Sequence, residues 1–313
     1  LGITREGRPI KIEPNPNAGQ FNCGTDARAQ ASVLDLYDVS KLKAPAMVNG
    51  GNVEETSWTK IDSFVKEGLA KAQASGKKIR IVSSTVNSPS TNAVIAAFIA
   101  KYPAAKLVQY DAVSYTGIIQ ANQNSFGKAV LPKYNFDKAD LIVSFGADFL
   151  GTWISGEEFT AQYTANRNYK SLENKKMSRH IQFESGMSLT GTNADTRVPI
   201  KLSEEGPALL ALYNAITGAN LEGAALPNNT TADKALKLVG KELLQNKGKA
   251  LVVSGSNDVS TQNLVNAINS AIGSYGTTID LDNPCKLYAG NDAEFAEFIN
   301  EMNRGEVAAV FLL

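Results

Sequence analysis

The stretch that most constrains the fold of this chain is Asp140–Trp153, DLIVSFGADFLGTW. It opens with the apolar run Leu141–Phe145, turns at Gly146 and continues through Asp148 into a Gly-Thr-Trp corner. An apolar run followed by a glycine and a helix is typical of a buried parallel strand that ends at a ligand crevice. We therefore expect any function of the chain at such strand ends, although an ordinary strand of an α/β sheet would show the same pattern.

Helical and strand-like segments alternate along the chain from Trp58 onward. The first helix has apolar residues at helical spacing, with Ser57 as its N-cap and Gly76 at its end. A second alternation follows the Gly/Asn/Pro-rich linker 218–230. The pattern predicts an α/β fold with two Rossmann-like parallel-sheet blocks, each covered by helices on both faces.

Changes in composition predict three regions. Residues 1–57 contain the segment GRPIKIEPNPNAG, which favours an extended N-terminal arm packing on the body, with a short helix over 27–37. Residues 58–222 are predicted to form a first α/β domain and residues 223–313 a second. Because the sequence stops at VAAVFLL, within a strand-like run, the second domain is expected to be truncated at its C-terminus.

Composition argues against several classes of function. The 31 basic and 31 acidic residues cancel, so nothing favours nucleic acid or an anionic membrane. No apolar run approaches the roughly 18–20 residues of a membrane helix. The single histidine, His180, is expected to be a strand residue with a satisfied hydrogen bond rather than a catalyst. Cys23 and Cys285 have no CxxC partner and cannot alone hold zinc or an iron–sulfur cluster, while a disulfide between them stays open.

Three strand ends have the residue types that a crevice needs, namely hydroxyls, small residues and free backbone amides. They are Ser83-Ser84-Thr85, Gly146-Ala147-Asp148 and Ser254-Gly255-Ser256-Asn257. None is a G-x-G-x-x-G or phosphate-binding loop, so ordinary turns remain an alternative at each. No pair of carboxylates has a spacing that forces two carboxyl groups together, so the residues alone predict no nucleophile, base or metal ligand.

Longer stretches resemble a known family. GRPIKIEPNP, ARAQASVLDLYD, the span Tyr110–Trp153 and ESGMSLTGTNADTRVPIK are similar to the molybdopterin oxidoreductase superfamily. More narrowly, they resemble the large molybdopterin-like/iron–sulfur subunit of bacterial alternative complex III. The resemblance implies that this chain is a piece of the molybdopterin-like part, and that iron–sulfur clusters lie only in the part of the subunit not present here.

The sequence departs from the family pattern where a cofactor would be held. Gly146-Ala147-Asp148-Phe149 stands in place of G-x-N-P, and Glu184-Ser185-Gly186 in place of Asp-Pro-Arg. Leu202-Ser203-Glu204-Glu205 replaces Pro-Gly-Thr-Asp, which adds negative charge where a pyrophosphate would pass. No cysteine stands where a molybdenum ligand is expected. These changes predict a vestigial crevice, with its residues as follows: Ser83, Ser84, Gly146, Ala147, Asp148, Glu184, Ser185, Ser254, Gly255 and Asn257.

The resemblance implies a domain that has lost its cofactor and acts as a structural and assembly scaffold in a quinol-oxidising respiratory complex, without catalysis of its own. Its partners would be multihaem cytochrome c and integral membrane subunits, in the periplasm and with no membrane span in this chain. The alternative is a fragment of a genuine molybdopterin enzyme that binds molybdopterin guanine dinucleotide. A third hypothesis is an unrelated α/β enzyme or sugar-binding protein.

Overall fold

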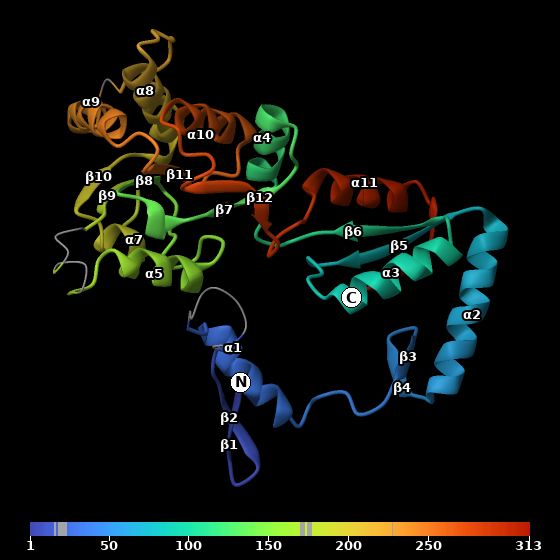
Figure 1. Ribbon diagram of the computed structural model, residues 1–313. Coiled ribbons are helices and arrows are strands. Elements are labelled where there is room, and N and C mark those ends of the chain that lie inside the picture. The colour runs from blue at the N-terminus through green and yellow to red at the C-terminus, as the bar shows by residue number, and fades with distance from the viewer. Residues whose placement is uncertain (16, 18–23, 170–172, 174–176, 227) are drawn as a thin grey trace. The chain divides into compact units, whose positions relative to one another are not determined.

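The computed structural model in Figure 1 describes residues 1–313 except 16, 18–23, 170–172, 174–176 and 227. Two compact units make up the chain, and each is discontinuous in sequence. Unit 1 contains Leu1–Asp26 and Tyr115–Tyr288, and unit 2 contains Ala27–Ser114 and Ala289–Leu313. Each unit is described below by itself.

Unit 1 is built on a parallel sheet of four strands in the order β10-β9-β8-β11. These strands are β8 (Leu141–Phe145), β9 (Arg179–Glu184), β10 (Thr196–Pro199) and β11 (Ala250–Ser254). Every residue of β8 and of β11 is buried, as expected for parallel strands covered on both faces. The four strands run in one direction, so their carboxyl ends meet at one edge of the sheet.

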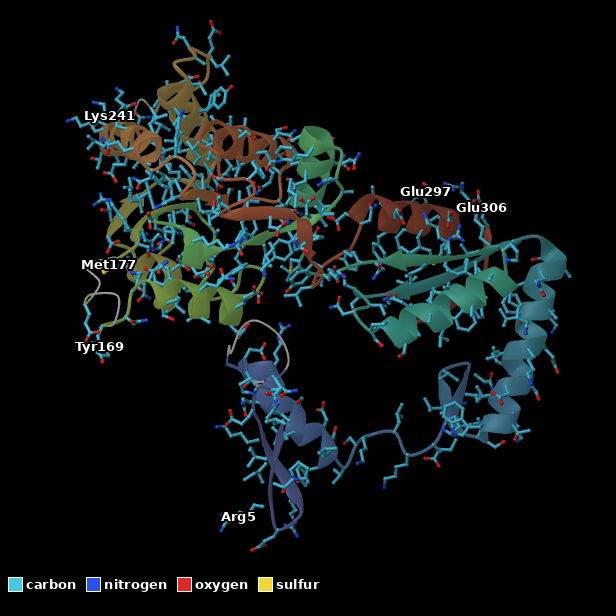
Figure 2. The ribbon with its side chains drawn as sticks, viewed as in Figure 1. Arg5, Tyr169, Met177, Lys241, Glu297 and Glu306 are labelled. Carbon is cyan, nitrogen blue, oxygen red and sulfur yellow. The ribbon has the colours of Figure 1, made fainter. Side chains whose placement is uncertain are left out.

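Three helices cover one face of this sheet: α8 (Glu205–Thr217), α9 (Thr230–Gln245) and α10 (Val259–Ala271) (Figure 1). Alternate residues of β8 and β11 point into this layer and pack against α8 and α9. Helix α9 is amphipathic, since Leu236, Val239 and Leu243 are buried while Lys241 points to solvent (Figure 2).

The other face is covered by α5 (Gly156–Ala165) together with aromatic side chains, among them Phe149, Trp153 and Phe159. The short helical segment η2 (Phe136–Lys138) packs against α5, while α7 (Leu189–Thr192) follows β9 and η3 (Leu202–Glu204) leads into α8. Helix α4 (Thr116–Phe126) ends at Gly127 in a left-handed conformation (φ 70°), which suits glycine at a helix C-terminus.

Two further strand pairs of unit 1 are antiparallel. Strand β7 (Leu131–Tyr134) pairs with β12 (Ile279–Cys285), and β1 (Gly2–Arg5) forms a hairpin with β2 (Arg8–Ile12). Strand β12 lies in the region predicted as a second parallel block, and the parallel pairing expected there is wrong for this strand, because β12 pairs antiparallel with β7. Strand β7 itself is not predicted; its four residues are too few for a clear period of two.

Unit 2 contains a second parallel sheet, in the order β13-β5-β6. Its strands are β5 (Lys78–Ser83), β6 (Ala105–Gln109) and β13 (Val307–Leu312). Helix α11 (Asp292–Asn303) covers one face, and α2 (Trp58–Ser75) and α3 (Pro89–Lys101) lie on the other (Figure 1). Ser57 caps α2 by accepting from the Lys60 N–H, and Gly76 ends it, both as predicted.

The residues that precede α2 form short elements with mostly exposed side chains. They are α1 (Ala27–Ala31), η1 (Ser32–Leu36) and the hairpin of β3 (Ala46–Asn49) with β4 (Asn52–Glu55). The predicted helix over 27–37 is therefore one turn of α-helix continued as a 3-10 helix. Packing of the arm on the body stays a prediction.

The predicted fold class, parallel α/β with helices on both faces, is confirmed. Strand pairing nevertheless divides the chain differently from the predicted boundaries at 57/58 and 222/223. Strand β11 adds to the sheet of β8, and β13 adds to the sheet of β5, so strands from both predicted domains share each sheet. None of the helices in the described part of the chain combines the length and the hydropathy of a membrane span.

Candidate functional site

A pocket of about 130 Å³ lies at the carboxyl ends of β8 and β9 in unit 1. It continues to the segment that follows β10 and to the first residue of α8. Its lining combines small, hydroxyl-bearing, charged and large apolar residues: Gly146, Phe183, Glu184, Ser185, Gly186, Ser188, Ile200, Lys201, Leu202 and Glu205. The pocket therefore brings together the predicted strand ends Gly146 and Glu184-Ser185.

The glycines that follow β8 and β11, Gly146 and Gly255, allow these two backbone segments to pass close together. Gly146 has φ +61°, and its N–H donates to the Phe183 carbonyl at 2.8 Å. The N–H of Gly255 donates to the Phe145 carbonyl at 2.8 Å, and a Cβ at Gly255 would stand only 2.5 Å from the Gly146 oxygen. Both amides are thus engaged within the protein and are not directed at a ligand.

Asp148 binds the α7 segment rather than facing the pocket. Its Oδ1 accepts hydrogen bonds from the Thr190 amide at 3.0 Å and the Thr190 hydroxyl at 2.8 Å. Its Oδ2 accepts from the amide of Thr152 at 3.3 Å. Its neighbour Ala147 is fully buried. We conclude that the carboxylate of Asp148 has a structural role, fastening the turn after β8 to the helix after β9.

Glu184 is a buried carboxylate held by several donors. Arg197 Nε donates to Oε1 at 2.6 Å, and the Ser188 hydroxyl donates to Oε2 at 2.6 Å. Burial acts to raise the pKa of Glu184, but the hydrogen bonds from Ser188 and Arg197 outweigh it and bring the pKa below its ordinary value. Glu184 is therefore ionised at neutral pH, and it adds a fixed negative charge at the pocket. Ser185, next in sequence, is exposed at the same pocket.

Glu205 supplies the second carboxylate of the pocket. Its Oε1 accepts a hydrogen bond of 2.5 Å from the hydroxyl of Ser254, the last residue of β11. Among the described residues it makes no ion pair. Burial raises the pKa of Glu205, and the hydrogen bond from Ser254 offsets this only in part. Ser254 is thus committed to Glu205 and, through its Oγ, to the Ser256 amide at 3.0 Å.

His180 lies in a buried polar chain that leads to Glu184. The Gln182 amide donates to Glu184 Oε2 at 3.2 Å, which directs Gln182 Oε1 to His180 Nε2 at 3.2 Å. His180 Nε2 is thereby placed to donate its proton to Gln182, and His180 Nδ1 lies 3.2 Å from the Tyr163 hydroxyl, which donates to the Asn193 carbonyl at 3.0 Å. Desolvation lowers the pKa of His180 to about 4, so the ring is neutral. The expectation of a strand histidine with satisfied hydrogen bonds is confirmed.

Asn257 contacts the start of α4 instead of the pocket. Its side-chain oxygen accepts a hydrogen bond from the Gly117 amide at 2.8 Å. A Cβ at Gly117 would overlap the Asn257 carbonyl, so glycine is needed for this close approach.

Trp153 is part of the unit 1 core, whereas Trp58 of unit 2 is 70% exposed and is not a core residue.

Ser83 and Ser84 belong to unit 2, at the end of β5, and are not among the residues that line the unit 1 pocket. Ser83 is buried and Ser84 is exposed. The neighbouring Thr85 donates through its amide and hydroxyl to Asp111, at 2.9 and 2.6 Å, which ties the ends of β5 and β6 together. Within the part of the chain that the structure describes, no group of three or more His, Cys, Asp or Glu residues could hold a metal ion.

Sequence reasoning did not single out Ser188 and Lys201, which line the pocket, or Arg197, which pairs with Glu184. Ser188 has a local signal, since it precedes α7 and caps it by accepting from the Gly191 amide at 2.9 Å. Arg197 has none, because its contact with Glu184 depends on the pairing of β9 with β10.

The fold and the pocket define a parallel α/β protein with a crevice at the carboxyl ends of two neighbouring strands, β8 and β9. No family model matches the sequence. Over 225 residues the chain is 20% identical to the molybdopterin-binding-like subunit of menaquinone reductase from Nitratidesulfovibrio vulgaris, covering 70% of this chain and 31% of that protein. Its fold is similar to that of acetylene hydratase from Pelobacter acetylenicus, with a TM-score of 0.58 and 11% identity over 87% of this chain and 39% of the other.

These findings confirm the resemblance to the molybdopterin oxidoreductases and their mixed α/β fold. The chain spans about a third of the length of the proteins it matches, 31% and 39% respectively. The activities of those longer proteins are therefore considered for this chain only under the proposed function.

Proposed function

We propose that this chain is a molybdopterin-oxidoreductase-like domain without its cofactor, serving as a structural scaffold in a respiratory, quinone-linked electron-transfer complex. The similarity to a molybdopterin-binding-like subunit of menaquinone reductase supports the respiratory setting. Electron transfer would take place in other subunits, so the proposal holds for either direction of quinone chemistry.

The observation that carries the proposal is the charge of the unit 1 pocket. Glu184 and Glu205 both line it, together with the cation Lys201; Glu184 is paired with Arg197, whereas Glu205 makes no ion pair among the described residues. A pterin dinucleotide carries a pyrophosphate, and a phosphate group beside an uncompensated carboxylate is electrostatically unfavourable. Phosphate sites in proteins instead present backbone amides, helix N-termini or guanidinium groups.

Two further features support the loss of the cofactor. The amides of Gly146 and Gly255 are bonded to Phe183 and Phe145, so they are not available to a pyrophosphate. The pocket volume of about 130 Å³ is below the roughly 300–1,000 Å³ typical of sites for small organic ligands. The residues present therefore do not fit an anionic dinucleotide, and we derive no reaction step through one.

The same proposal includes partners and location. Multihaem cytochrome c and integral membrane subunits of one complex would bind this domain, and they would attach it to the periplasmic side of the membrane. The family resemblance supports this assignment, as does the description of the relative as a subunit. Iron–sulfur clusters would belong to the part of the subunit outside this chain.

Metal and cofactor analysis of the purified native complex tests the proposal. We expect no stoichiometric molybdenum or tungsten assignable to this subunit, and no fluorescent pterin after oxidation of the denatured sample. Stoichiometric metal together with a pterin product would instead establish the alternative, a genuine molybdopterin enzyme. As a control for the role of charge, the dinucleotide is also added to the Glu205→Gln variant, in which a neutral amide replaces the carboxylate of Glu205 in the pocket.

A further inference from the structure

The pocket of unit 1 contains one carboxylate that has no counter-charge. Glu205 Oε1 accepts the hydrogen bond from Ser254, but Glu205 Oε2 accepts none from the described residues. Burial and the bond from Ser254 are the causes of the shift in the Glu205 pKa, and no cation of the described residues contributes to it. The ionised form of Glu205 is therefore an unneutralised anion on the pocket wall.

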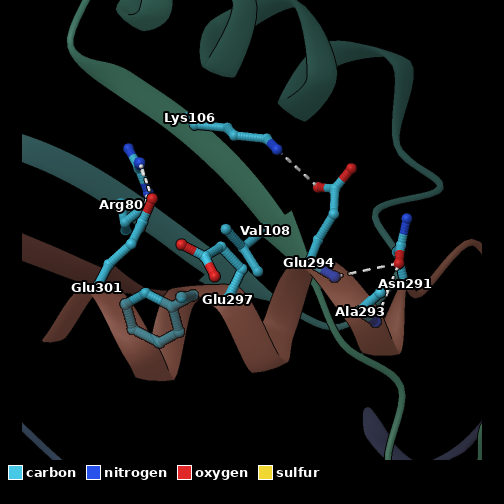
Figure 3. Close-up of a pocket in the computed structure, with 9 residues that line it drawn as sticks. Arg80, Lys106, Val108, Asn291, Ala293, Glu294, Glu297 and Glu301 are labelled. Carbon is cyan, nitrogen blue, oxygen red and sulfur yellow. Dashed lines mark hydrogen bonds and ion pairs between the residues drawn. The ribbon is translucent and has the colours of Figure 1, made fainter. Parts of the chain in front are cut away.

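The pocket of unit 2 has no such carboxylate. This pocket, of about 250 Å³, lies between helix α11 and strand β6 (Figure 3). Each of its three carboxylates is paired: Glu294 with Lys106 at 3.1 Å, Glu301 with Arg80 at 2.8 Å and Glu297 with Arg304 at 2.8 Å. A cation from outside would have to displace one of these pairs, whereas in unit 1 it would meet a free carboxylate oxygen.

The free oxygen of Glu205 faces open space beside Gly146. Apart from the chain neighbours of Gly146, Glu205 Oε2 is the one described heavy atom within 4 Å of the position that a Cβ would take there, at 3.7 Å. The pocket around this space has a volume of about 130 Å³. That volume is roughly the share of four water molecules in the liquid, so the pocket admits a slender side chain and not a nucleotide.

Hydrogen bonding selects the kind of cation that fits. Both oxygens of Glu184, the other carboxylate of the pocket, are held by Arg197 and Ser188, so a metal ion would gain a single carboxylate oxygen. A guanidinium group prefers two carboxylate oxygens side by side, and one oxygen of Glu205 is engaged by Ser254. An ammonium group is a compact point charge, and one free oxygen is sufficient to bind it.

The apolar walls of the pocket suit the methylene chain of a lysine. Phe183, Ile200 and Leu202 line the pocket, and Leu202 is 77% exposed. A lysine side chain covers apolar surface with its methylenes while its ammonium group binds a polar atom. Lys201 of this chain also lines the pocket, but it makes no ion pair with Glu205 in the described part of the chain.

We propose that the unit 1 pocket receives a lysine side chain of a partner protein, whose ammonium group donates a hydrogen bond to Glu205 Oε2. Charge complementarity with the unpaired carboxylate is the basis of this assignment. The inference rests on the proposed function, because a pterin dinucleotide would occupy the same space. It gives the scaffold a specific anchor point, at which the crevice binds a neighbouring subunit in place of a cofactor.

The test uses the 313-residue chain at pH 8, where the raised pKa of Glu205 leaves more of its carboxylate ionised than at pH 7. The probe is the peptide acetyl-Gly-Ser-Lys-Ser-Gly-amide, and its binding is followed by the amide NMR signals of Gly146 and Ser185. We expect a dissociation constant in the millimolar range. Peptides with norleucine or arginine in place of the lysine are the matched controls, and they should bind about tenfold more weakly.

Two variants of the chain test whether the lysine peptide binds at this carboxylate. Glu205→Gln should weaken its binding about tenfold, because the amide that replaces the carboxylate is neutral. Glu222→Gln makes the same change at an exposed position outside the pocket lining, and it should leave the affinity unchanged. The comparison of the peptides on the unaltered chain decides the question even if Glu205→Gln fails to fold.

Equal binding of the lysine and norleucine peptides, or equal effects of the two variants, would overturn the proposal. Binding of n-butylamine without binding of the lysine peptide would overturn it in favour of a site for a free amine. If the lysine peptide does not bind and the native complex contains no pterin, this inference fails while the proposed function stands. A pterin in the pocket would contradict both.

Discussion

The Ser254 hydroxyl donates a hydrogen bond of 2.5 Å to Glu205 and so joins the end of β11 to the start of α8. Glu205 lines the pocket at the carboxyl ends of β8 and β9, so the contact fixes one of its walls. A helix N-terminus with nearby glycines is elsewhere an anion site, because its amides are unsatisfied. Here the first residue of the helix is itself a glutamate that lines the pocket, and this negative charge is the basis of the proposed loss of cofactor.

The first prediction concerns Glu205. Because its pKa is raised by burial, the protonated form favours the folded state, and this contribution is present below the ordinary pKa and lost as pH rises through the raised one. Glu205→Gln should therefore stabilise unit 1 at pH 7 by about 1 kcal/mol and have little effect near pH 4. Urea unfolding at both pH values measures the difference; a variant that is less stable at pH 7 would contradict the assignment.

Trp153 provides a probe of unit 1 alone. The chain has two tryptophans, Trp58 and Trp153, and Trp58 is exposed in unit 2. In a Trp58→Phe background, tryptophan fluorescence then reports unfolding of unit 1 without a contribution from unit 2. We expect this substitution to change the free energy of unfolding of unit 1 very little.

The second prediction concerns His180. Its pKa is lowered by desolvation to about 4, so between pH 6.5 and about 4 the unfolded chain binds a proton that the folded chain does not. Stability of unit 1 should fall as pH falls through this range, by on the order of 3 kcal/mol in total. His180→Gln should reduce that dependence. An unchanged pH dependence in the variant would mean that His180 is not buried in its neutral form.

The third prediction concerns the pair of Glu184 and Arg197. Glu184→Met leaves the Arg197 guanidinium without its partner and should cost about 3 kcal/mol. Arg197→Met alone should also destabilise unit 1, whereas Glu184→Met with Arg197→Met should cost less than the two separate effects added together. Additive effects in this double-mutant cycle would show that the pair is not coupled.

The fourth prediction concerns the ion pair that holds α11 on the sheet of unit 2. Arg80 and Glu301 are each 7% exposed, so loss of one partner should cost about 3 kcal/mol, more than loss of an exposed pair. Hydrogen exchange of α11 amides should accelerate in Arg80→Met and less in Arg80→Met with Glu301→Met. Lys237→Met is the control, because its pair with Asp233 is exposed and lies in α9.

Local signals were sufficient for much of the fold. The apolar run of β8 and the glycine after it, and the caps Ser57 and Gly76 of α2, depend on neighbouring residues, and the structure has them as predicted. These features need no knowledge of distant contacts. The class of fold therefore follows from the sequence.

Pairing between distant strands could not be predicted in the same way. Strand β13 lies beside β5, with Leu312 opposite Val82, and no local pattern specifies that partner. The same holds for the site, where Arg197 meets Glu184 only because β10 pairs with β9. The acidic character of Glu205 was visible in the sequence, but its contact with Ser254 depends on β11 joining β8.

An experimental density map of the assembled native complex tests the central claim most directly. The account predicts that the space between Gly146, Glu184 and Glu205 contains protein side chains and water alone. A pterin dinucleotide seated in that space, with its pyrophosphate beside either carboxylate, would contradict it.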